Sequence, residues 1–81
     1  MSEDLTAAQI AANYEGMLHA VQSITDIIDG NTLSPFNNAN KQDYMDRSVG
    51  HLEAMKVKTF WTTEDMSPID AAITAGKAWS E

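Results

Sequence analysis

The sequence contains no cysteine among its 81 residues, so no disulfide can stabilise the fold. Only two histidines are present, His19 and His51, and neither lies in a zinc-binding spacing. We therefore expect no metal and no cofactor. A single domain of this size, residues 1–81, has a small core, which leaves regular helix packing or oligomerisation to stabilise it.

Basic residues are scarce. The chain has 5 basic and 12 acidic residues, for a net charge of −7, and no basic residue precedes Lys41. An acidic surface repels phosphate and anionic lipid headgroups, so we expect no direct contact with nucleic acid and none with a membrane. The acidic surface either keeps the protein soluble or docks on a basic partner.

Long apolar runs are also missing. No segment approaches the roughly 20 apolar residues that span a bilayer. The first residues show neither a basic region nor an apolar region of the secretory type, so we expect no signal peptide. We expect the protein to act inside a cell or inside an assembly.

What the sequence does contain is helical periodicity. Apolar residues alternate at spacings of three and four from Ala7 to Ile28, which predicts an amphipathic helix over about 7–29. Thr6 and Gln9 form a capping box, with a hydrophobic staple of Leu5 and Ile10 around it. Gly30 suits the left-handed conformation that ends a helix.

Two further helices are predicted, over about 41–58 and about 68–79. In the first of these, Asn40 is the expected N-cap and a mid-helix glycine, Gly50, indicates a close helix contact. In the second, Ser67 is the expected N-cap and Pro68 the first helical residue. Between them, Thr62 can cap one short turn. Since no strand pattern appears, the predicted fold is all-α, a three-helix bundle built as a long helical hairpin with a short third helix.

The first predicted helix has a second face made of small residues. Ala8, Ala12, Gly16 and Ala20 recur at every fourth position. They lie opposite the row of bulky apolar residues, and we expect Ile28 to belong to that bulky row and Ile27 to lie on the side of the small residues. Alanine is a good helix former on any exposed face, but propensity alone would not select Gly16. The alternatives are therefore a solvated face or a contact with sister chains or a larger partner.

The candidate interface residues are Ala12, Gly16, Ala20, Trp61 and Trp79. The two tryptophans are either core anchors or interface anchors. The paired carboxylates, such as Glu3/Asp4, Asp43/Asp46 and Glu64/Asp65, lie near predicted helix starts, where capping explains them. No catalytic group is indicated, and we expect no enzyme activity.

Residues 46–53, 60–66 and 71–78 (DRSVGHLE, FWTTEDM and AAITAGKA) resemble the C-terminal part of short, uncharacterised proteins of tailed bacteriophages. The resemblance covers about residues 45–78. It implies a viral context, either a virion component or an early host-directed protein, located in the virion or the host cytoplasm. It carries over no activity and no catalytic residue.

Together these observations predict a non-enzymatic protein–protein interaction module. The favoured form is a small phage structural or accessory protein that self-associates, as a homo-oligomer, or binds a larger assembly. The alternative is an acidic inhibitor of a host nucleic-acid-binding protein, which would use the base-free first half of the chain as a phosphate mimic.

Overall fold

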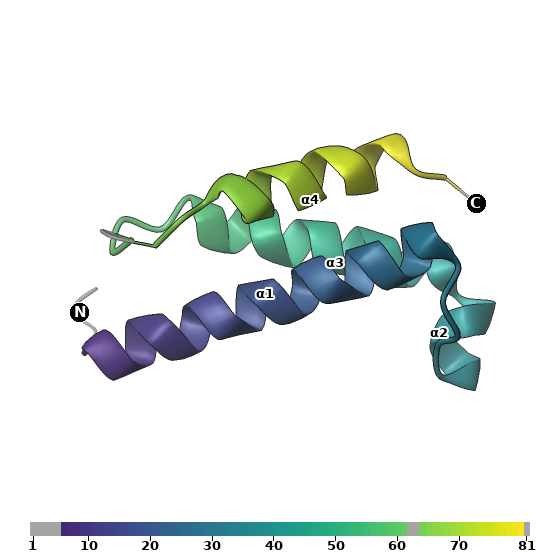
Figure 1. Ribbon diagram of the computed structural model, residues 1–81, viewed down its shortest axis with the longest axis horizontal. Helices are drawn as coiled ribbons and strands as arrows, with labels where there is room; N and C mark the ends of the chain where they lie inside the picture. The colour runs from purple at the N-terminus through teal and green to yellow at the C-terminus, as the bar shows by residue number, and fades with distance from the viewer. Residues whose placement is uncertain (1–5, 62–63, 81) are drawn as a thin grey trace.

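The computed structural model describes residues 6–61 and 64–80 and shows an all-α bundle. Its helices are α1 (Ala7–Asp29), α2 (Pro35–Ala39), α3 (Lys41–Lys56) and α4 (Ser67–Ala78). Figure 1 shows α1 and α4 running in the same direction, with α3 antiparallel to both and α2 at the end of the bundle where α1 ends. The described residues form no strand, which confirms the predicted fold class.

The bounds of α1 follow from local capping signals, as predicted. The Thr6 hydroxyl accepts a hydrogen bond from the Gln9 amide at 3.1 Å, and the Gln9 side chain accepts one from the Thr6 amide at 2.9 Å. At the other end Gly30 has a φ of 76°, which favours glycine because a Cβ would be strained there. Leu5, the other half of the expected staple, lies outside the described residues.

The connector after α1 contains a five-residue helix, α2. Ser34 caps α2 by accepting the Asn37 amide hydrogen at 3.3 Å, and Pro35 takes the first helical position. Asn40 is the N-cap of α3, as predicted, but its side chain does not form the capping hydrogen bond. The Asn40 side-chain amide donates to the Phe36 carbonyl at 2.7 Å, so it closes α2 and makes no cap bond to α3.

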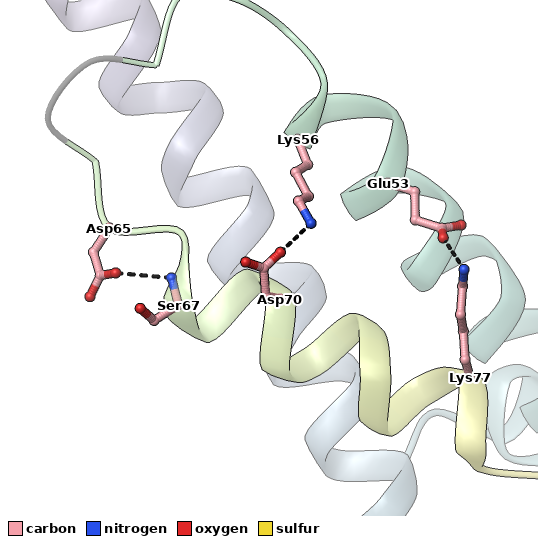
Figure 2. A network of polar contacts seen from close by, with 6 residues as sticks. All are labelled: Glu53, Lys56, Asp65, Ser67, Asp70 and Lys77. Carbon is pink, nitrogen blue, oxygen red and sulfur yellow. Dashed lines mark hydrogen bonds and ion pairs between the residues drawn. The ribbon is translucent and has the colours of Figure 1, made fainter.

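The start of α4 also differs from the prediction. Ser67 is the first helical residue and not the N-cap, which is Met66. The Asp65 carboxylate accepts a hydrogen bond from the Ser67 amide at 2.9 Å and so performs the role expected of the serine (Figure 2). The proposed cap at Thr62 lies outside the described residues, and residues 64–66 are not helical.

The core lies where α1, α3 and α4 meet. Its buried side chains confirm most of the predicted apolar faces, but Ile27 is 3% exposed and Ile28 is 41% exposed, the reverse of the expectation. The reason is that α1 packs against two helices, so its buried face is centred between them. The buried hydrophobic residues are Met17, Ile24, Ile27, Met45, Val49, Leu52, Ile69, Ala72 and Ile73.

The close helix contact occurs at Gly76 of α4 and not at Gly50. A Cβ built on Gly76 would lie 2.5 Å from Cγ2 of Val49 on α3, whereas one on Gly50 would meet nothing within 4 Å. Gly50 is exposed, so the contact predicted for it within this chain is wrong. Glycine at position 76 lets α4 approach α3 closely.

Two ion pairs join the solvent edges of α3 and α4 (Figure 2). Lys56 pairs with Asp70, and Lys77 pairs with Glu53. All four side chains are roughly half exposed, and pairs in such positions contribute about 0–1 kcal/mol each. Stability therefore comes mainly from the apolar core, and the pairs engage one lysine of each helix, Lys56 of α3 and Lys77 of α4.

Candidate interaction surface

The small residues of α1 lie on its solvent side. Ala12 and Gly16 are exposed, and a Cβ on Gly16 would meet no atom within 4 Å. Ala20 is half-buried and packs against the edge of the core. We call Ala12, Gly16 and Ala20 the α1 outer face. Neither α3 nor α4 covers Gly16, so its lack of a side chain serves no contact within this chain.

A groove adjoins the α1 outer face at Ala20. It lies between α1, α2 and α3 and has a volume of about 380 Å³. Across it, the Ser23 and Tyr44 hydroxyls share a hydrogen bond of 2.8 Å, which links α1 to α3. Phe36 lines it from α2 and is 68% exposed, a large apolar ring in contact with water. A groove lined by an exposed aromatic ring can receive a side chain of a partner protein.

The groove brings together residues that sequence reasoning kept apart. His19 of α1 and His51 of α3 both line it, as does Arg47. The Arg47 guanidinium pairs with Asp43 at 3.0 Å. Because these two residues are one helical turn apart, the sequence could have indicated this ion pair, but not that the two histidines share the groove. No group of three potential metal ligands occurs in the part of the chain that the structure describes.

The two tryptophans make contacts within the chain. The Trp61 indole nitrogen donates to the Met55 carbonyl at 2.9 Å, and its ring meets Tyr14 edge-on with centroids 6.2 Å apart. Trp79 is half-buried at the other end of the core, just past α4. Neither lines the groove beside the α1 outer face, so the structure brings together only three of the five candidate interface residues.

Several carboxylates have local structural partners. Asp46 accepts a hydrogen bond from Gln42 at 3.0 Å, and Asp26 accepts one from Gln22 at 2.9 Å. The pKa of Asp65 lies below its usual value, because the carboxylate accepts hydrogen bonds from the Ser67 amide and side chain. The same hydrogen bonds that lower this pKa hold the Asp65 carboxylate at the start of α4.

Comparisons with known proteins do not extend these observations. The sequence matches no protein-family model, and neither a curated protein nor a solved structure is significantly similar to it. Among the described residues, no helix is long and apolar enough to cross a membrane. The resemblance to phage proteins therefore stays a prediction.

Proposed function

We propose that this protein is a non-enzymatic protein–protein interaction module that self-associates through the α1 outer face. The observation that carries the proposal is Gly16, an exposed glycine in the middle of a 23-residue helix with open space where its Cβ would be. Glycine destabilises a helix by about 1 kcal/mol relative to alanine, and no contact within the chain offsets this loss. A helix from a second copy would use the space.

The shape of the surface supports a pair of identical chains. Helix axes approach to about 8 Å when the residues between them are small, and Ala12 and Gly16 provide such a surface. In a twofold arrangement each patch meets its own copy, so an exposed Phe36 on one chain can enter the groove beside Ala20 on the other. The contact would combine close helix packing with burial of an aromatic ring.

The test is the absolute mass in solution, measured by light scattering on a sizing column over a hundredfold dilution. We expect wild type to be an oligomer, and we expect Gly16→Leu to stay helical but to run as a monomer, because leucine would hold the helices apart. Gly50→Leu is the matched control, since Gly50 is also an exposed, mid-helix glycine with nothing within 4 Å of a Cβ. An unchanged mass for Gly16→Leu, or a monomeric wild type, would contradict the proposal.

The biological setting follows the resemblance noted above. In that setting the protein is a virion or accessory component, in the virion or the host cytoplasm, and the self-associated form joins a larger assembly.

An acidic inhibitor of a basic host protein is the second candidate, favoured by the charge of α1. This helix carries three acidic residues and no basic one. That candidate requires a monomer at every concentration and a partner affinity that falls steeply with added salt.

A further inference from the structure

A second groove, between α1 and α4, is more apolar than the one beside the α1 outer face. It has a volume of about 340 Å³, and Thr25 is its one polar lining residue. The rest of the lining comes from two helices: Val21, Ile24, Ile28, Pro68, Ala71, Ala72 and Ala75. Ile28 is 41% exposed and, nearby along α1, Leu18 is 37% exposed. These are two of the large hydrophobic side chains that the bundle leaves in contact with water.

The walls of this groove have the spacing of helix-packing positions. On α1, the lining residues Val21, Thr25 and Ile28 are separated by four and three residues, and Leu18, three residues before Val21, continues this row outside the groove. On α4, Pro68, Ala71 and Ala75 are separated by three and four. Apolar rows at alternating three- and four-residue intervals receive the side chains of a facing helix. The exposed alanines on α4 allow that helix to lie close, as in other helix-in-groove complexes.

The charges along the groove indicate what such a helix would carry. Asp29 lies one turn after Thr25, and Glu15 lies about one turn before Leu18. In the described part of the chain neither carboxylate forms an ion pair, and α1 supplies no basic residue to balance them. On α4 the one basic side chain, Lys77, is engaged with Glu53 of α3 (Figure 2). We call Glu15 and Asp29, the carboxylates that flank the groove's α1 segment along the chain, its acidic rim; no basic residue of α1 balances them.

From the apolar lining, the helical spacing and the acidic rim, we propose that the α1–α4 groove binds an amphipathic helix of another protein whose apolar row is flanked by lysine or arginine. A second copy of this chain fits less well. Its α1 would bring like charges to the rim, and the apolar row of α3, the helix with the most basic residues, is buried in its own core. This contact is separate from self-association through the α1 outer face.

The experiment uses the full chain and three synthetic helical peptides of roughly 20 residues, a length at which isolated helices become appreciable in water. The first peptide has a leucine–alanine heptad row flanked by lysines. The second has the same row flanked by glutamates, and the third is a scrambled lysine peptide. Affinity is measured by fluorescence anisotropy at low and high salt, and the binding site is mapped by amide chemical shifts. We expect the lysine peptide to bind about tenfold tighter than the glutamate peptide, an effect the size of two exposed charge pairs.

Variants of the groove separate its shape from its charge. The pair Ala71→Gln and Ala75→Gln fills the exposed floor with good helix formers and should weaken the lysine peptide about tenfold. The matched control, Ala11→Gln with Ala54→Gln, changes exposed alanines outside both the groove and the α1 outer face, and it should leave the affinity unchanged. Glu15→Gln with Asp29→Asn keeps the shape and should remove most of the preference for lysine over glutamate.

Several results would overturn the proposal. These are no binding of the lysine peptide, equal affinity for the lysine and glutamate peptides, or shifts that map away from α1 and α4. A wild-type oligomer whose contact maps to this groove would assign it to a second copy instead. Because the Gly16→Leu variant leaves the groove intact, titrating that variant tests the groove independently of self-association.

Discussion

The sharpest test of the packing is Gly76→Ala, which adds one methyl group at the closest approach of α3 and α4. That methyl would lie 2.5 Å from Cγ2 of Val49, 3.1 Å from the sulfur of Met45 and 3.6 Å from Cγ2 of Ile24. The methionine can turn aside because its side chain is flexible. Val49 cannot, since a valine in a helix is nearly confined to one rotamer and this one is buried.

Two opposing effects set the magnitude. Replacing glycine by alanine inside a helix stabilises it by about 1 kcal/mol. Overpacking a tight core costs about 1–3 kcal/mol, and a contact this short at a stiff side chain belongs near the upper end. We therefore expect a net loss of about 1–2 kcal/mol, which for a chain of this size lowers Tm by roughly 4–16 °C.

The assay is urea denaturation followed by far-ultraviolet circular dichroism, with Gly50→Ala as the control. The control makes the same change in an open position and should stabilise the protein by about 0.5–1 kcal/mol. Shortening the neighbour should relieve the clash, so Gly76→Ala should cost less in a Val49→Ala background than in wild type. The reasoning fails if Gly76→Ala is as stable as Gly50→Ala, or if its cost is the same in both backgrounds.

Two further predictions concern the segment that leads into α4. Trp61→Phe removes the indole hydrogen bond to the Met55 carbonyl, and we expect a loss of about 1–2 kcal/mol in the same urea assay, where an unchanged midpoint would show that the bond contributes nothing. Asp65 has a lowered pKa in the folded state, so its stabilising effect is complete above its unfolded value of about 3.9 and is lost as the pH falls through the folded value. We expect the difference between the urea midpoints at pH 7 and below pH 4 to be smaller for Asp65→Asn than for wild type. An equal difference in both proteins would refute this role.

The sequence predicted the ends of α1 correctly because those signals are local. The Thr6 and Gln9 capping box and the left-handed Gly30 depend only on neighbouring residues, so spacing was sufficient. Ser67 was assigned wrongly for a related reason. Serine and aspartate are both good caps, and only the backbone after residue 64 decides that Asp65 is the one that reaches the first amide of α4.

The phase of the core could not be predicted from α1 alone. Two flanking helices determine which side of α1 is buried, and their placement exchanges Ile27 and Ile28 relative to the expectation. The same is true of Gly50 and Gly76. Both lie within helices, but only the position of Val49 shows which of them is at a close contact. His19 and His51 share a groove for the same reason, since residues 32 positions apart are brought together only by the antiparallel packing of α1 and α3.

The unequal lengths of the helices explain why α1 has surface to spare. It has 23 residues, against 16 in α3 and 12 in α4, so at 1.5 Å per residue it extends well beyond α4. One side of α1 is covered by the core, while the side bearing Gly16 and the edge bearing Ile28 are not. These two surfaces differ in chemistry. The first consists of small residues and adjoins an exposed Phe36, whereas the second is an apolar groove whose α1 segment is flanked along the chain by Glu15 and Asp29. Packing within the chain requires neither the α1 outer face nor the apolar groove to be left uncovered. We therefore infer that α1 contacts other proteins through both surfaces.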